Sequence, residues 1–122
     1  MQNETLYKQE ILEHYKHPRQ FGHLDVFTNS AQLVNASCGD EIEVTLKISK
    51  SGIIEDVMFT GSGCAISIAS ASILCELIKG KSVEQFSNLK AEDILKSMGM
   101  DNGSPRVKCA LLGWEALRKA IK

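Results

Sequence analysis

Three of the four cysteines lie at positions where the sequence pattern changes, and these are the residues best suited to chemistry. Cys38 lies between two predicted strands, Cys64 follows the glycine-rich residues 61–63, and Cys109 lies at the start of the last predicted helix. A cysteine in the first turn of a helix lies near unpaired backbone N–H groups, which lower the thiol pKa and favour the thiolate. Cys64 and Cys109 are both predicted to occupy such positions, where the side chain is presented on a fixed backbone.

Metal binding is the chemistry that these residue types favour. Three thiolates suit zinc or an iron–sulfur cluster, and Asp40, two residues after Cys38 in a predicted loop, offers a carboxylate oxygen as a more labile fourth ligand. The cysteines lie much farther apart in the chain than the closely spaced pairs of zinc ribbons and ferredoxins. Spacing alone therefore leaves metal ligands, reactive thiols and small core residues as alternatives.

Two further residues receive different predictions. Cys75 lies in the middle of a predicted apolar helix, so we expect it to be a core residue rather than a ligand. Lys108 precedes Cys109 and is either a solvated lysine or an auxiliary residue whose charge holds Cys109 as a thiolate and later pairs with Asp40. With that neighbour and its position at a helix start, Cys109 is the cysteine most favoured as a thiolate nucleophile. The histidines His14, His17 and His23 are expected to be surface or packing residues.

Sequence periodicity predicts the elements that must position these residues. Ile42, Val44, Leu46 and Ile48 alternate with polar residues, which is typical of a strand with one buried face. Residues 32–34 and 53–60 are predicted strands, residues 4–16, 64–79, 91–98 and 107–121 are predicted helices, and Ser82 with Gln85 forms a capping box before a further short helix. The glycines at 39, 61 and 63 are interpreted as turn residues with positive φ or as parts of mobile loops. The pattern predicts an α+β fold, in which a small antiparallel three-stranded sheet packs with about five helices.

Amino-acid composition bears on the number of domains and on the classes of partner that the protein can bind. A chain of 122 residues with 43% hydrophobic content is expected to form a single domain over residues 1–122. The 14 basic and 15 acidic residues are not segregated into blocks, which argues against nucleic acid as a partner. The sequence contains no secretory signal and no apolar run that could span a membrane, so we expect a cytoplasmic protein with reduced thiols and no membrane partner.

Several segments around these residues resemble one known family. The segments are Tyr-Lys-His-Pro-Arg at 15–19, Ala-Ser-Cys-Gly-Asp at 36–40, Gly-Ile-Ile-Glu-Asp at 52–56, Phe-Thr-Gly-Ser-Gly-Cys-Ala-Ile-Ser at 59–67 and Val-Lys-Cys-Ala-Leu-Leu at 107–112. Together they resemble the U-type iron–sulfur scaffold family, which comprises IscU proteins, SufU proteins and the N-terminal domain of NifU. The resemblance implies that Cys38, Asp40, Cys64 and Cys109 bind the metal or cluster.

The resemblance also implies a function and leaves an alternative open. The expected function is that of a scaffold, not a turnover enzyme, which assembles a [2Fe–2S] cluster from ferrous iron and persulfide sulfur supplied by a cysteine desulfurase and passes it to apo-proteins. Cys109 is then the candidate acceptor of the persulfide sulfur, with Lys108 as the auxiliary residue. The alternative is a zinc-dependent sulfurtransferase of the SufU type. Lys108 is SufU-like, because IscU-type members carry histidine there, whereas the absence of an insertion between Cys64 and Cys109 is IscU-like. A structural zinc domain is a weaker third hypothesis, and the sequence leaves open whether two chains form a homodimer around one cluster.

Overall fold

The computed structural model describes residues 4–37, 39–101 and 103–122. The order of the elements is α1 (Glu4–Lys16), β1 (Asn29–Asn35), β2 (Asp40–Ile48), β3 (Ile54–Ser62), α2 (Ala65–Ile78), α3 (Val83–Ser87), α4 (Ala91–Ser97) and α5 (Val107–Ile121). The predicted α+β fold, with its three-stranded antiparallel sheet and five helices, is confirmed.

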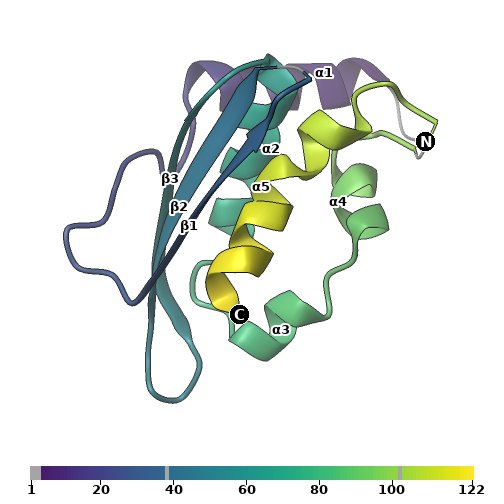
Figure 1. The fold of residues 1–122 in the computed structure, drawn as a ribbon. Helices are drawn as coiled ribbons and strands as arrows, with labels where there is room; N and C mark the ends of the chain where they lie inside the picture. Colours follow the sequence, from purple (N-terminus) through teal and green to yellow (C-terminus); the bar gives the residue numbers. More distant parts are fainter. Residues whose placement is uncertain (1–3, 38, 102) are drawn as a thin grey trace.

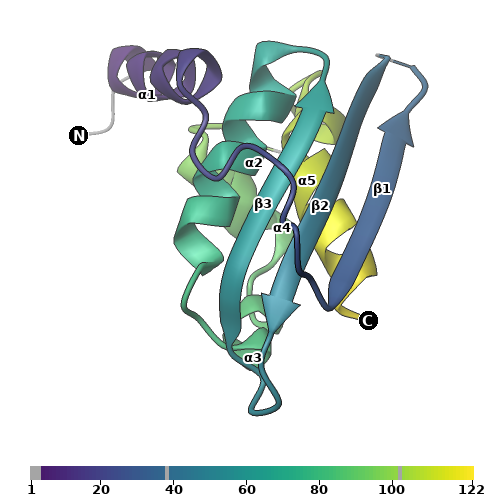
Figure 2. The same cartoon turned by 90° about the vertical axis from the view of Figure 1, so that its left-hand side faces the viewer.

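The sheet has the order β1-β2-β3, and the helices α2 and α5 pack against one of its faces (Figure 1). The segment that follows α1 crosses the opposite face before it enters β1 (Figure 2). This segment also covers the outer edge of β3, since the Phe59 N–H donates to the Gln20 carbonyl and the Phe59 carbonyl accepts the Gly22 N–H, at 2.9 and 2.8 Å.

The core forms between the inner face of the sheet and the apolar faces of α2 and α5. Ile42, Val44 and Leu46 are fully buried, as their alternation in the sequence predicts. The helices α2 and α5 approach closely where Gly113 faces Ala71, because a Cβ at Gly113 would lie 3.1 Å from the Ala71 side chain. This contact brings the middle turns of the two helices close together.

The buried face of α1 differs from the apolar face that the sequence predicts. Leu12 and Tyr15 belong to the predicted apolar stripe, yet they are 50% and 44% exposed, whereas His14 is buried. His14 Nδ1 lies 2.7 Å from the Ser72 hydroxyl on α2, and the same hydroxyl accepts the Arg19 N–H at 2.7 Å. A polar contact therefore fixes α1 on α2, and the interpretation of His14 as a packing residue is confirmed.

The predicted turn features are confirmed in part. Ser82 and Gln85 form the expected capping box at the start of α3. Gly39 and Gly63 have φ angles of 72° and 138°, but Gly61 does not have positive φ and lies inside β3, which continues to Ser62. The prediction that Gly61 is a turn residue is wrong, because it is part of β3. A glycine is needed there for a different reason: a side chain would collide with the neighbouring strand β2.

Within the described residues, no helix is both long enough and apolar enough to cross a membrane.

Candidate metal centre

The candidate ligands come from three segments that meet at one end of the sheet. Asp40 is the first residue of β2, Cys64 is the N-cap residue of α2, and Cys109 is the third residue of α5. The strand β3 ends where β2 begins, and the chain passes there from β3 into α2 (Figure 2). The Cys64 N–H at this junction reaches the Asp40 side chain. The fold thus brings together residues that are far apart in the sequence.

The geometry suits a metal ion. One ligand atom each from Asp40, Cys64 and Cys109 can be chosen so that all three lie within 4.8 Å of one another. On a tetrahedral zinc with bonds of about 2.3 Å, two thiolates lie about 3.8 Å apart. A small closing movement would therefore bring these donors to coordination distance, and the mixed sulfur and oxygen set fits zinc or iron.

Cys38, the fourth predicted ligand, lies outside the described residues. The residues on either side of it belong to the turn that joins β1 to β2: the Gly39 N–H donates to the Asn35 carbonyl at 2.9 Å, and the Ser37 N–H donates to the Asn35 side chain at 3.2 Å. This turn leads directly into Asp40. The assignment of Cys38 as a ligand stays a prediction.

Asp40 is fully buried, with 0% of its surface exposed, and lies in a strand rather than in the predicted loop. Its Oδ1 accepts the Cys64 N–H at 2.9 Å, and its Oδ2 accepts the Ser67 hydroxyl at 2.6 Å and lies 3.6 Å from Cys64 Sγ. Burial on its own raises the pKa of the Asp40 carboxyl, but the hydrogen bonds from Ser67 and Cys64 outweigh it and hold the pKa below its ordinary value. The structure therefore favours an ionised carboxylate.

Gly63 allows this arrangement. A Cβ at residue 63 would overlap the Asp40 carboxylate, and the φ of 138° is itself unfavourable for other residues. The chain between β3 and α2 therefore passes close enough to Asp40 for the Cys64 N–H to reach it.

Ser67 is the site residue that the sequence analysis missed. Besides its bond to Asp40, its Oγ lies 3.2 Å from the Cys109 carbonyl oxygen and 3.7 Å from Cys64 Sγ. The available signal was its spacing, because a residue three positions after Cys64 lies on the same side of a helix. In a helix rich in small residues, that spacing did not distinguish Ser67 from a packing residue.

The two described site cysteines differ in accessibility. Cys64 is half-buried, and burial raises the pKa of its thiol, but hydrogen bonds from the Ser67 and Ile66 backbone N–H groups contribute to holding the pKa below its ordinary value. Cys109 is only 3% exposed. The expectation that the position at the start of a helix exposes the cysteine side chain is therefore wrong for Cys109, which belongs to the first turn of α5 and is buried.

Cys75 is confirmed as a core residue. It is fully buried, and this burial raises the pKa of its thiol to about 12. It is surrounded by the apolar core of α2, α5 and the sheet. The residue is therefore held as a neutral thiol, away from the ligand cluster.

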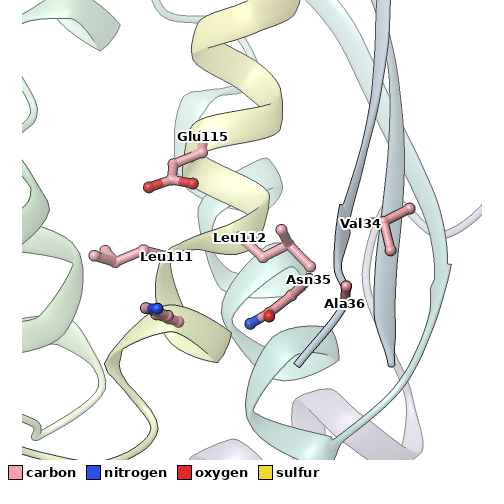
Figure 3. Close-up of a pocket in the computed structure, with 7 residues that line it drawn as sticks. Val34, Asn35, Ala36, Leu111, Leu112 and Glu115 are labelled. Atoms are coloured by element: carbon pink, nitrogen blue, oxygen red, sulfur yellow. The ribbon is translucent and has the colours of Figure 1, made fainter. Parts of the chain in front are cut away.

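Lys108 lies beside the ligands rather than among them. Its side chain is exposed and lines a groove of about 270 Å³. The labelled residues of this groove come from the end of β1 and from α5 (Figure 3). Asn35 and Glu115 line the same groove. The carboxylate of Asp40 has Ser67, Cys64 and Cys109 as its hydrogen-bond partners, so the pairing of Lys108 with Asp40 after the metal has left stays a prediction.

Comparison with known proteins gives a consistent result. The family model described as "NifU-like N terminal domain" matches residues 6–122. The zinc-dependent sulfurtransferase SufU of Bacillus subtilis is 38% identical over 137 aligned positions, covering 97% of this chain and 90% of that protein. The scaffold protein IscU of Aquifex aeolicus is 37% identical over 119 positions, covering 95% and 74%. A crystal structure from Fervidobacterium islandicum, described as a candidate iron–sulfur cluster assembly scaffold for the SUF system, has a TM-score of 0.78 and 30% identity, and the match covers 99% of this chain and 100% of the other.

Proposed function

The chain belongs to the family of NifU-like N-terminal domains, and on this basis we propose that it is a scaffold for the assembly of a [2Fe–2S] cluster. The observation that carries the proposal is the convergence of Asp40, Cys64 and Cys109, whose ligand atoms lie within 4.8 Å of one another. With Cys38 as a third thiolate, these residues would hold iron while the cluster forms. The same four residues are the proposed iron, cluster and zinc ligands.

The mixed ligand set supports transient rather than permanent binding. A carboxylate binds a soft-ligand metal less tenaciously than a thiolate does, so a site with one carboxylate releases its metal more readily than one with four thiolates. This property fits a protein that receives iron and sulfur and delivers a finished cluster to apo-proteins. We propose that the chain acts in the cytoplasm as one domain over residues 1–122.

Sulfur would arrive from a cysteine desulfurase as a persulfide. The acceptor thiolate, for which Cys109 remains our candidate with Lys108 beside it, attacks the terminal sulfur of the desulfurase persulfide. The S–S bond of the desulfurase breaks, a new S–S bond forms on the acceptor, and the desulfurase leaves as a thiolate. Reduction of this sulfur to sulfide then draws electrons from ferrous iron and from an external thiol or ferredoxin reductant. Because Cys109 is buried, the start of α5 would have to open for this transfer.

A second candidate function is that of a zinc-dependent sulfurtransferase, an enzyme activity, in which zinc is held by the same residues. It is supported by the similarity to SufU of Bacillus subtilis and by Lys108 before the third cysteine. The alignment with that protein is longer than this chain of 122 residues, so SufU carries residues that have no counterpart here, whereas the alignment with IscU of Aquifex aeolicus is shorter than the chain. This difference favours the scaffold.

The test is anaerobic purification followed by analysis of iron, zinc and acid-labile sulfide, together with a visible spectrum. The scaffold is expected to yield sulfide and iron in equal amounts and a charge-transfer spectrum after incubation with desulfurase, cysteine and ferrous iron. Stoichiometric zinc that stays in place without sulfide, together with persulfide on a site cysteine, would favour the transferase instead.

Cysteine variants serve as matched controls for this test. Cys64→Ala is expected to lose metal and cluster, whereas Cys75→Ala, in the same helix region but in the core, is expected to retain both. Loss of metal in Cys75→Ala with retention in Cys64→Ala would show that the ligand assignment is wrong.

A further inference from the structure

Ser67 is a buried hydroxyl that contacts the candidate ligands without being one of them. It is fully buried on α2, and its strongest contact is the 2.6 Å hydrogen bond to Asp40 Oδ2. A hydroxyl has a single proton to donate. The two other acceptors in reach, the Cys109 carbonyl oxygen at 3.2 Å and Cys64 Sγ at 3.7 Å, are both farther away than the carboxylate oxygen, so the proton is directed to the carboxylate.

Contacts other than the Ser67 hydrogen bond also hold the Asp40 carboxylate in place. The backbone at Gly63 packs against the carboxylate so closely that no side chain fits there, and the Cys64 N–H holds Oδ1 at 2.9 Å. What Ser67 adds is a donor to Oδ2, the oxygen that lies 3.6 Å from Cys64 Sγ and therefore faces the thiol ligands.

We infer that Ser67 is a positioning residue that acts through Asp40 and keeps this carboxylate a weak, readily released metal ligand. The inference rests on the metal centre of the proposed function. A hydrogen bond to Oδ2 withdraws electron density from the oxygen that would bind the metal. The same bond satisfies the carboxylate when the metal has left, which matters because Asp40 is fully buried and cannot turn to bulk water. Ser67 thus weakens the bond between Asp40 and the metal and stabilises the Asp40 carboxylate after the metal has left.

The test is the rate at which zinc leaves the protein, measured with a chromogenic chelator in excess after loading with one equivalent of zinc. Ser67→Ala is expected to release zinc about tenfold more slowly than the unmodified protein, as expected when one hydrogen bond to a charged group is removed. Ser67→Thr, which keeps the hydroxyl, is expected to restore the original rate. Circular dichroism and thermal unfolding of each variant establish that it is folded before its rate is compared.

Ser70→Ala is the matched control. Ser70 is also buried on α2, but its hydroxyl donates to the Ala110 carbonyl oxygen at 2.6 Å rather than to a ligand. Its removal is expected to leave the zinc release rate within about twofold, because a lost neutral hydrogen bond acts on stability and not on the ligand.

A double-variant comparison separates an effect through Asp40 from a general change in packing. In an Asp40→Ala background, Ser67→Ala is expected to have no further effect on the release rate. Equal or faster release in Ser67→Ala, or the same slowing in the Asp40→Ala background, would overturn the inference. A wild-type protein that binds no zinc but assembles a cluster would overturn the inference alone, and one that binds neither zinc nor a cluster would overturn both the inference and the proposed function. Zinc binding without any cluster or persulfide would overturn the proposed function alone.

Discussion

At Asp40, a charged side chain is buried at the end of a strand, and the surrounding groups are all arranged to donate to it. The Cys64 N–H and the Ser67 hydroxyl would be left without this acceptor if the carboxylate were removed. A buried donor that loses its acceptor costs about 1–3 kcal/mol. Asp40 is therefore a structural residue as well as a candidate ligand, which its prediction as a loop residue did not indicate.

Replacing Asp40 is expected to separate these two roles. We expect Asp40→Ala to lower the free energy of unfolding of the metal-free protein by about 1–3 kcal/mol. The same variant is expected to hold an assembled cluster longer and to transfer it more slowly to an apo-ferredoxin, because the ligand that leaves most readily is absent. The measurement is the decay of visible absorbance with and without acceptor at equal loading. Glu41→Ala, an exposed neighbour, is the control. Faster loss and faster transfer would identify Asp40 as a holding ligand.

Cys75 gives a prediction about reactivity. Because burial raises the pKa of its thiol to about 12, the native protein should contain almost no Cys75 thiolate at pH 8.5. We expect iodoacetamide to leave Cys75 unmodified in the folded protein and to label it after unfolding in guanidinium chloride, as read by mass spectrometry of peptides. Labelling of Cys75 at the same rate in the folded and unfolded chains would show that the residue is not in a closed core.

At the scale of the elements, the sequence predicted the helices and strands well because their signals are local. The alternation in β2, the capping box at Ser82 and the apolar run of α2 each lie within a few residues. The buried face of α1 could not be predicted in this way. His14 is buried because Ser72, 58 residues away in the sequence, supplies its hydrogen-bond partner, and no property of residues 4–16 reveals that contact.

The docking of α1 should depend on pH. Burial, followed by the charge of Arg19, lowers the pKa of His14 below its value of 6.5 in an unfolded chain. The folded state therefore disfavours protonated His14. The contribution of neutral His14 to the free energy of unfolding is complete above about pH 6.5 and is lost as the pH falls through the folded-state pKa. Glu76, Glu10 and Glu13 act in the opposite direction and limit the shift.

The measurement is the free energy of unfolding between pH 7.5 and 5, followed by the fluorescence of Trp114, the single tryptophan. We expect the wild type to lose stability over this range and His14→Gln to lose less, since glutamine can accept the Ser72 proton without titrating. His17→Gln is the control for an exposed histidine in the same region. Identical pH profiles for the wild type and His14→Gln would contradict this account.

Prediction of the candidate site from the sequence has the same limit as prediction of the buried face of α1, because contacts between distant segments have no local signal. Residue types and the positions of the cysteines at element boundaries marked Cys64, Cys109 and Asp40 only as candidates, and the family resemblance implied that they are ligands. The structure brings all three together. The role of Ser67 and the burial of Cys109 depend on how α2 and α5 pack at the end of the sheet. Such packing joins segments that are more than 40 residues apart and has no local signature.

At the scale of the whole molecule, a bound metal would join β2, α2 and α5, so its effect on stability should be global. Zinc that binds only the folded chain stabilises it by about 2.7 kcal/mol at a hundredfold excess over Kd, which corresponds to a rise of about 10 °C in the unfolding midpoint. Calorimetry with zinc and with EDTA measures this rise. Magnesium, which prefers oxygen ligands, and zinc added to Cys64→Ala should both leave the midpoint unchanged. A zinc effect that persists in Cys64→Ala would place the binding elsewhere.

The three buried serines of α2 have a consequence for how the native protein opens. Ser67, Ser70 and Ser72 reach respectively to Asp40, to the start of α5 and to the junction after α1. A fluctuation that displaces α2 must break all three connections in one step, so the backbone amides of α2, the first turn of α5 and the end of α1 should exchange their hydrogens with deuterium as one cooperative unit. Since two of these connections adjoin the ligand cluster, occupancy of the metal centre should slow exchange even in the last turn of α1, at the far end of this network.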